Sequence, residues 1–354
     1  MIDSLHIENF RSLKRFQIDS LKRVNLIAGK NNTGKSSLLE AVALYACKGK
    51  MNDVLRLLEN RGEYSPATNV PDFTEFNIRS LSRLFADGKI EYGSGSAIRI
   101  GDRDSSVRLR FVKYLYNPQT NAPERVLPDN ENNPNAKTGF EIRCDGSFLI
   151  QLDMPVSRFE NVIVPDRYKF VGATDVHGGA NDKLFDGITL TERESSVIDA
   201  LRIIEPRVER IAFVADRYSA MRNPVVKLSG LRDVSPMSGM GDGINRILTI
   251  ILALVNVENG YLLIDEFENG LHYKVQERLW NVIFKTAKEL NAQVFATTHS
   301  NDCIRSFGNV LNNPDYDADD GKLIRLDRKD DTVSRTEFDA RELRIANVRS
   351  IEIR

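Results

Sequence analysis

The segment GKNNTGKS, Gly29–Ser36, matches the pattern G-x-x-x-x-G-K-[S/T]. It follows an apolar run that predicts a strand, Arg23–Ala28, and opens a segment whose apolar spacing predicts a helix, Ser36–Cys47. Glycines let backbone N–H groups turn inward, and the start of a helix adds a favourable dipole for an anion. The pattern therefore predicts a phosphate-binding loop, with Lys35 on the β- and γ-phosphates and Ser36 on Mg²⁺. The expected contact residues are Asn31, Asn32, Thr33, Gly34, Lys35, Ser36 and Ser37.

Two carboxylates follow a second apolar run. Asp265 and Glu266 come directly after Tyr261–Ile264, which predicts a buried strand. Because ligand sites of α/β proteins lie at the carboxyl ends of strands, Asp265 is expected to hold Mg²⁺ through water or through Ser36. Glu266 can then orient and polarise an attacking water. The alternative interpretation of this pair is a surface turn without chemistry.

A histidine ends a third apolar run. His299 follows Gln293–Thr297, so it also lies at the carboxyl end of a predicted strand. A histidine there can hydrogen-bond a γ-phosphate oxygen and hold the hydrolytic water. The alternative is a histidine that caps a helix or packs in the interior.

These motifs must be brought together by the elements around them. Strands and helices alternate over residues 1–60 and 190–310, an order that indicates parallel strands joined by crossover helices. We therefore expect an α/β fold whose parallel core sheet is built from these two segments.

The rest of the chain has other patterns. Residues 61–189 change to a period of two and contain an Asp145-Gly146 hairpin signal, which predicts an inserted antiparallel β lobe. Thr191–Glu194 fits a capping box at the start of a helix. Residues 311–354 predict a carboxy-terminal hairpin and helix.

The three motifs together resemble the ATP-binding cassette (ABC) superfamily, and within it the branch of structural-maintenance (SMC), RecF-like and OLD-like AAA family ATPases. Lys35 matches the Walker A lysine of that branch, and Asp265 with Glu266 matches its Walker B pair. His299 matches its switch histidine. The resemblance implies a P-loop fold of the ABC type and hydrolysis of ATP with Mg²⁺.

Two further segments carry this resemblance. The opening IENFRSLKRFQI is similar to the first hairpin of the branch, and Glu268–His272 is similar to its D-loop. The resemblance covers about residues 1–50 and 190–310. No glutamine stands in the context of the family's Q-loop, because Gln119 and Gln151 lie elsewhere in the predicted lobe.

The resemblance also gives a role to the segment SPMSGMGDGINR, which begins at Ser235. In that superfamily, a turn rich in serine and glycine starts a helix and binds the γ-phosphate of the nucleotide held by the other subunit. One residue more than the usual Ser-Gly-Gly-Gln spacing leaves open whether Ser235 or Ser238 supplies the hydroxyl. Close packing is the alternative role for the glycines. The implied contacts in trans are Ser238, Gly239, Gly241, Asp242 and Gly243.

Composition gives weaker indications. A formal net charge of -1 does not support attraction of the whole surface to nucleic acid or membrane. Cys47, Cys144 and Cys303 are scattered without metal-ligand spacing, which fits a reducing compartment. The amino terminus lacks a signal-peptide pattern, and the longest apolar run, Ile247–Val255, is too short to cross a membrane. We expect a cytoplasmic protein without a membrane partner.

The functional expectation is an ATPase switch that dimerises head to tail around ATP, as a homodimer or a higher homo-oligomer. By resemblance, such short ATPases act in bacterial anti-phage systems with a separately encoded toxin or nuclease; only 55 residues follow His299, too few for a nuclease domain. The alternative is a RecF- or SMC-like clamp on DNA. A third class is an ATP-binding scaffold with negligible turnover. Basic residues for the clamp are Arg11, Lys14, Arg15, Arg108 and Arg110.

Overall fold

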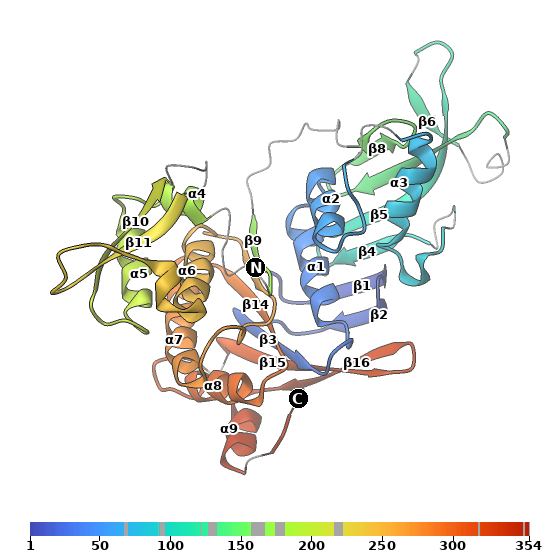
Figure 1. Ribbon diagram of the computed structural model, residues 1–354. Coiled ribbons are helices and arrows are strands. Elements are labelled where there is room, and N and C mark those ends of the chain that lie inside the picture. Colours follow the sequence, from blue (N-terminus) through green and yellow to red (C-terminus); the bar gives the residue numbers. More distant parts are fainter. Residues whose placement is uncertain are drawn as a thin grey trace.

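Figure 1 shows the computed structural model of the chain. It describes residues 1–66, 70–90, 92, 96–120, 122–126, 133–156, 167–173, 181–215, 222–317, 319–349 and 351–353. The described strands form a six-stranded, a seven-stranded and a three-stranded sheet. The six-stranded sheet lies near the middle of the view in Figure 1, and the seven-stranded sheet lies at its upper right.

The six-stranded sheet carries the strand ends at which the sequence motifs lie. Its order is β16-β15-β3-β14-β13-β9, and neighbours pair in parallel except in the β15–β16 hairpin. The predicted parallel core sheet is therefore confirmed. Its strands are β3 (Val24–Gly29), β9 (Tyr168–Val171), β13 (Tyr261–Ile264), β14 (Gln293–Thr298), β15 (Gly321–Lys329) and β16 (Thr332–Phe338).

Helices cover both faces of this sheet. Its central strands alternate between two hydrophobic cores: Leu26 and Ala28 of β3 face one core, and Ile27 faces the other. A parallel sheet buried on both faces requires apolar residues at nearly every position, which explains the continuous apolar runs in the sequence. None of the described helices is both long and apolar enough to cross a membrane. The helices are α1 (Lys35–Ala46) in the second core, and α6 (Asp242–Val255), α7 (Tyr273–Glu289) and α8 (Asn301–Leu311) in the first.

The seven-stranded sheet is antiparallel throughout, which confirms the predicted antiparallel lobe. Its order is β2-β1-β4-β5-β7-β8, with β6 beside β5. Asp145, at φ 55°, lies in the turn between β7 and β8, so the predicted hairpin is present. The elements of the lobe are β1 (Leu5–Phe10), β2 (Leu13–Ile18), α2 (Met51–Asn60), α3 (Phe73–Ser82), the 3₁₀ turn η1 (Ala86–Gly88), β4 (Ile98–Gly101), β5 (Ser106–Tyr116), β6 (Pro123–Arg125), β7 (Lys137–Arg143) and β8 (Ser147–Gln151).

Strands cross the boundaries of the division made from the sequence. β1 and β2 lie within residues 1–60, yet they pair with the antiparallel lobe. β9 lies within residues 61–189, and the β15–β16 hairpin lies within residues 311–354, yet both belong to the parallel sheet. The chain therefore passes between the two sheets several times, so each sheet is built from segments that are far apart in the sequence.

The three-stranded sheet ends in the segment SPMSGMGDGINR, which we call the signature segment, because its first two residues form β12. Its order is β10-β11-β12. The predicted capping box before α5 is wrong: the Thr191 hydroxyl donates to the carbonyl of Ile188 at 2.6 Å, and Glu194 accepts from the backbone N–H of Leu190 at 2.8 Å. Both side chains bond the preceding turn instead of the first helical N–H groups. The elements are α4 (Asn181–Asp186), α5 (Glu192–Leu201), β10 (Val208–Ala215), β11 (Arg222–Leu228), β12 (Ser235–Pro236) and the 3₁₀ turn η5 (Met237–Met240).

The last helix, α9 (Ala340–Val348), packs closely on α8. At Gly308 of α8, an added Cβ would lie 2.9 Å from Nδ2 of Asn347 and 3.4 Å from Cβ of Leu343. The two helices therefore approach more closely at this point than a larger residue permits.

We predict that Gly308→Val separates α9 from α8. Overpacking of this kind costs about 1–3 kcal/mol, so the melting temperature should fall by about 2–4 °C or more. Backbone-amide hydrogen exchange should rise in 340–348. Arg305→Val is the matched control, because Arg305 is exposed on the same helix. Equal effects of the two substitutions would contradict the close contact.

Candidate active site

The phosphate loop lies between β3 and α1, as the sequence predicts. Gly34 immediately precedes the helix at φ 96°, a conformation that L side chains rarely adopt. The Lys35 ammonium donates to the carbonyl oxygens of Gly29 and Lys30, both at 2.8 Å, so its side chain curls over the loop. The hydroxyl of buried Thr33 donates to the carbonyl of Lys30 at 2.9 Å and fixes the turn.

Lys35 is a buried cation. Burial lowers its pKa, and the nearby carboxylates of Asp265, Glu268 and Glu266 act in the opposite direction. A partly desolvated ammonium at the start of a helix is a strong donor for phosphate oxygens. The loop therefore has the chemistry that a polyphosphate requires.

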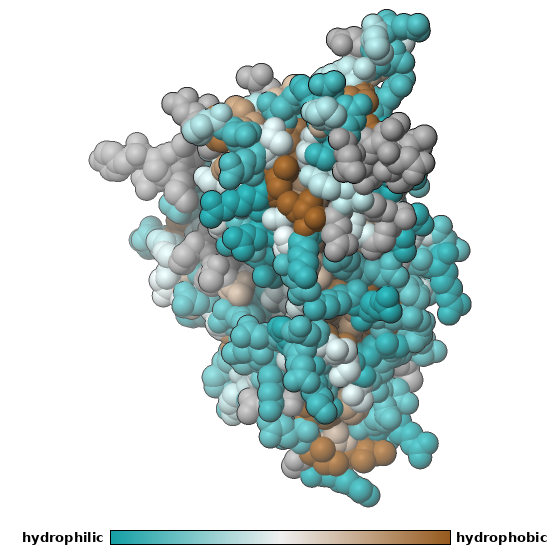
Figure 2. All heavy atoms as spheres, turned by 90° about the vertical axis from the view of Figure 1, so that its right-hand side faces the viewer, coloured by the Kyte–Doolittle hydropathy of each residue, from teal (hydrophilic) through white to brown (hydrophobic). Residues whose placement is uncertain are grey.

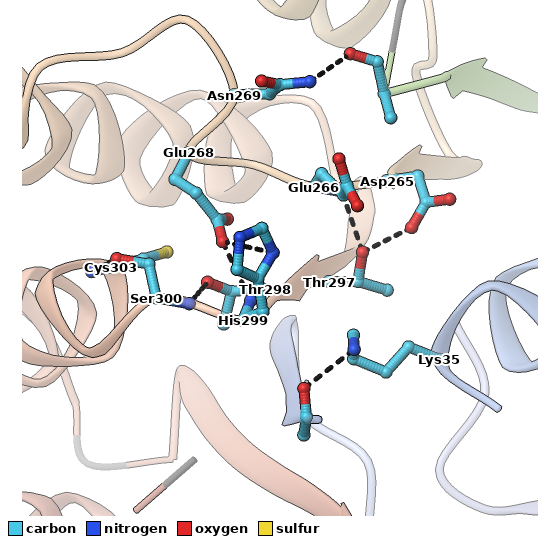
Figure 3. A network of polar contacts seen from close by, with 12 residues as sticks. Lys35, Asp265, Glu266, Glu268, Asn269, Thr297, Thr298, His299, Ser300 and Cys303 are labelled. Carbon is cyan, nitrogen blue, oxygen red and sulfur yellow. Dashed lines mark hydrogen bonds and ion pairs between the residues drawn. The ribbon is translucent and has the colours of Figure 1, made fainter. Parts of the chain in front are cut away.

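Asp265 connects three elements of the core. Its Oδ2 accepts a hydrogen bond from the Ser36 hydroxyl at 2.9 Å, and its Oδ1 accepts one from the Thr297 hydroxyl at 2.5 Å. The Thr297 oxygen in turn accepts from the backbone N–H of Glu266 at 2.8 Å (Figure 3). Parallel register places these groups at one edge, because Ile264 pairs with Ala296 immediately before Asp265 and Thr297.

The turn after β13 is held by a buried arginine. Arg246 of α6 has no exposed surface, and its guanidinium donates to the carbonyl oxygens of Gly172, Asp265 and Glu266 at 2.6, 2.7 and 3.0 Å. Glu266 adopts φ 50°, which is uncommon for a residue with a side chain. The two hydrogen bonds to Asp265 and Glu266 therefore stabilise a turn that projects Glu266 from the strand end, and the third ties this turn to Gly172 after β9.

His299 is held by Glu268. One oxygen, Oε1 of Glu268, accepts from the backbone N–H of His299 at 2.8 Å and lies 3.2 Å from its Nδ1 (Figure 3). The His299 side chain is 50% exposed, whereas that of Glu268 is 10% exposed, so the carboxylate positions a ring that solvent can reach. Ser300, not His299, caps α8 by accepting from the N–H of Cys303.

The predicted nucleotide residues share one cavity of about 640 Å³, a size within the range of small-molecule sites. Thr33 is not among its lining residues, and His299 lies in a neighbouring cavity of about 580 Å³ with Glu268. The residues lining the first cavity are Arg11, Ser12, Asn31, Asn32, Gly34, Lys35, Ser36, Ser37, Arg61, Arg83, Asp265, Glu266 and Arg328.

Four arginines line this cavity: Arg11, Arg61, Arg83 and Arg328. Arg11 is anchored by Glu40, whose Oε2 lies 2.7 Å from its Nε, and Arg61 contacts the other oxygen of Glu40 at 2.6 Å. Burial raises the pKa of the Glu40 carboxyl, while the two arginines act in the opposite direction. Arg83 is exposed at the rim. Lys35 and the exposed Arg83 favour an anionic ligand in this cavity.

Ser36 and Asp265 fit a role as magnesium ligands. A hydroxyl and a carboxylate 2.9 Å apart present oxygen donors to one point. Among the described residues, no cluster of three or more His, Cys, Asp or Glu side chains could hold a metal by itself. Magnesium commonly takes one or two protein oxygens and completes its shell with phosphates and water, so this sparse donor set suits it.

The signature segment does not join the cavity of its own chain. Ser238 is exposed in η5, whereas Ser235 is half-buried in β12 and pairs with Val226. A Cβ at Gly243 would lie 3.0 Å from the carbonyl of Gly270, so this glycine serves close packing against the D-loop segment. Gly239, Gly241 and Asp242 line neither cavity, and a Cβ at either glycine would meet no atom within 4 Å.

Three positioning residues were absent from the predicted site. The sequence does contain a feature that could have identified Thr297, because this polar residue follows the apolar part of the strand and lies close to His299. Arg246 also has one, since it is the one charged residue between Ile244 and Val255, a largely apolar stretch of the sequence. Glu268 was assigned to the D-loop segment, but its contact with His299 depends on tertiary structure.

Comparisons with known proteins identify the family of the chain. Residues 24–303 match the family described as "AAA domain, putative AbiEii toxin, Type IV TA system". The chain is 25% identical over 373 residues to a Helicobacter pylori protein named ATP/GTP phosphatase, and the match covers 94% of each chain.

Other matches cover less of the chain. An uncharacterised Methanocaldococcus jannaschii protein is 51% identical over 135 residues, which is 33% of this chain and 62% of that protein. The DNA replication and repair protein RecF of Clostridium acetobutylicum is 30% identical over 116 residues, which is 32% of this chain and 30% of that protein.

The fold has solved counterparts. The structure of an SMC head bound to the C-winged helix domain of ScpA superimposes with a TM-score of 0.53 at 16% identity, covering 96% of this chain and 98% of that chain. At this identity the likeness shows the fold, and it confirms the predicted P-loop fold of the ABC type. With the family match across most of its length and the nucleotide motifs gathered at one sheet edge, the chain belongs to this AAA family and is an ATPase.

Proposed function

We propose that this chain is a switch in which two copies associate head to tail around ATP and Mg²⁺, as a homodimer or within a higher homo-oligomer. The observation that supports this proposal is the separation of two sets of phosphate-binding groups in one chain. Lys35 and Ser36 line the large cavity, whereas Ser238 and Gly239 are exposed and line neither described cavity. A second copy can bring its signature turn to the open side of the loop.

Within each site, most of the catalytic effect comes from positioning and charge. Lys35 and the loop N–H groups hold the triphosphate. Bound Mg²⁺, held by Ser36 and Asp265, would neutralise charge on the phosphate oxygens. Glu266, fixed by the hydrogen bonds to its backbone, accepts a hydrogen bond from the attacking water and aligns it.

His299 and the signature complete the site. The exposed His299 ring, held by Glu268, hydrogen-bonds the terminal phosphate. From the other copy, the Ser238 hydroxyl and the N–H groups at the start of α6 bind the same phosphate. The exposure of Ser238 supports it over the half-buried, strand-paired Ser235. Hydrolysis would therefore occur only when the two copies have closed around ATP.

The switch would control a separately encoded effector, a toxin or a nuclease, in a bacterial anti-phage system. The family description, which names a toxin and a toxin–antitoxin system, supports a defence role of this kind. ATP binding would set one state of the complex, and hydrolysis would return it to the other.

A second candidate is a DNA clamp, which the partial similarity to RecF supports. Of the basic residues proposed for it, Arg11 pairs with Glu40 and Glu63, and Arg110 pairs with Glu141. These buried pairs reduce the charge available to phosphates. Duplex DNA that stimulates ATP hydrolysis with a steep dependence on salt would favour the clamp over the effector switch.

We predict that two inactive variants restore each other. Lys35→Ala removes the loop lysine, and Ser238→Arg blocks the signature turn. In a mixed dimer, one site combines intact Lys35 of one copy with intact Ser238 of the other. An equimolar mixture should therefore hydrolyse ATP at about a quarter of the wild-type rate, because half of the dimers contain one intact site.

The matched control mixes Lys35→Ala with Glu266→Gln. Both residues belong to the same half of a site, so the mixed dimer contains no intact site and should remain inactive. The shared site would be excluded if neither mixture recovered ATP hydrolysis, or if both did.

We predict that Thr297→Val slows hydrolysis without weakening nucleotide binding. The substitution keeps the shape but removes the hydroxyl between Asp265 and the N–H of Glu266. The kcat should fall by about tenfold to a hundredfold, while the Kd for ATP stays within about threefold. Thr286→Val, at a buried position in α7, is the control. A kcat equal to that of the control would show that the Thr297 hydroxyl does not position these carboxylates.

A further inference from the structure

The outer face of α9 carries exposed hydrophobic side chains away from the ATP site. Among the residues that the structure describes, ten large hydrophobic side chains are exposed, and three of them lie in or just after α9: Ile345 is 43%, Val348 79% and Ile351 55% exposed. Figure 2 shows hydrophobic surface at the lower end of the molecule, the end that α9 forms in Figure 1. Single exposed hydrophobic residues are ordinary, but a group of this kind marks an interaction site.

The two sides of α9 have different patterns: one is buried against the core, and the other is exposed. Ala340, Leu343 and Ala346 are buried against the core beside α8, which accounts for the packing of the helix. The exposed side has its own spacing of i, i+3, i+4 and i+7, which forms a continuous line along a helix. We name this line, together with the next residue, the α9 stripe: Arg341, Arg344, Ile345, Val348 and Arg349.

The arginines of the stripe give it a positive charge, and none of them is paired within the part of the chain that the structure describes. Arg341, Arg344 and Arg349 are exposed, and none forms an ion pair or side-chain hydrogen bond with any residue that the structure describes. Glu342 is on the same helix, but it belongs to the capping box, where its carboxylate accepts from the N–H of Asp339 at 2.9 Å. Arg305 of α8, whose carbonyl accepts from Asn347, adds a further exposed arginine beside the helix.

The chemistry of the stripe indicates its ligand. Arginines alone would suit a nucleic-acid backbone, but Ile345 and Val348 lie between them and would oppose phosphates. Arginine and aliphatic side chains at helical spacing instead match a helix that carries carboxylates beside apolar residues, since guanidinium groups bind carboxylates in pairs of hydrogen bonds. Charge complementarity therefore favours an acidic protein segment.

We propose that the α9 stripe docks an acidic amphipathic helix of a second protein. This proposal goes beyond the ATP switch and does not depend on the shared active site. The apolar side chains supply the buried centre of the contact, and the arginines form its charged rim and set the orientation. The close packing at Gly308 fixes α9 against α8, so the stripe loses little conformational freedom on binding.

The test uses a fluorescein-labelled peptide of about four helical turns, with glutamates and leucines at i, i+3, i+4 and i+7. Its binding to the full chain is followed by fluorescence anisotropy. A second peptide has the same composition in scrambled order. We expect the patterned peptide to bind at least about tenfold more tightly than the scrambled one, and binding to weaken as salt is added.

Surface variants locate the contact. Val348→Asp and Arg344→Glu should each weaken peptide binding by about tenfold or more, and their melting temperatures should stay at the wild-type value because both side chains are exposed. Leu190→Asp, at a side chain 90% exposed, and Arg103→Glu, at an exposed arginine of the lobe, are the matched controls and should bind the peptide normally.

Three results would overturn the proposal. One is equal binding of the patterned and scrambled peptides to the wild-type chain. Another is loss of binding in the control variants to the same degree as in the stripe variants. The third is an effect of Val348→Asp and Arg344→Glu on self-association or duplex-DNA binding while peptide binding is unchanged, which would assign the stripe to a second copy or to nucleic acid.

Discussion

The carboxylate of Asp265 between two hydroxyl groups is the contact on which the site depends. It joins Ser36 at the start of α1 to Thr297 at the end of β14, so the phosphate loop and two strand ends share one hydrogen-bonded group. The parallel register of β3, β14 and β13 makes this contact possible. A slip of one residue would turn Thr297 to the other face of the sheet and break the connection.

Two helices connect this group to distant surfaces. α6 begins after the signature turn, and its Arg246 holds the carbonyl oxygens of Asp265 and Glu266. α8 begins after His299, and its other end packs on α9 through Gly308. A shift of α6 would therefore move the Asp265–Glu266 turn, and a shift of α8 would move His299. The exposed signature turn lies at the start of α6, and the α9 stripe belongs to the helix that packs near the end of α8.

Much of the core could be predicted from the sequence because its signals are local. The glycine pattern around Lys35 and the apolar strand before Asp265 each identify an element and a residue role without tertiary information. Parallel strands then bring Lys35, Ser36, Asp265 and Glu266 to one cavity, as expected.

Other features could not be predicted because they depend on distant contacts. The pairing of β1 with β4 places the first hairpin in the antiparallel lobe, and no local signal distinguishes this from pairing with β3. The Thr191 hydroxyl finds the carbonyl of Ile188 before any helical N–H group, so a sequence pattern alone gave the wrong cap. Arg246 stands out in the sequence as a charged residue within an apolar run, but its partners are backbone carbonyl oxygens, which no sequence pattern identifies.

Cross-linking between copies tests the shared site most directly. One chain carries Asn31→Cys in the phosphate loop and the other Ser238→Cys in the signature, both with Glu266→Gln to retain ATP and Cys144→Ser, because the other two cysteines are buried. If the site is built from both copies, a short bis-maleimide should join the two chains in the presence of ATP and leave them largely separate without it. Absence of the joined pair, or the same yield without ATP, would contradict a site built from both copies.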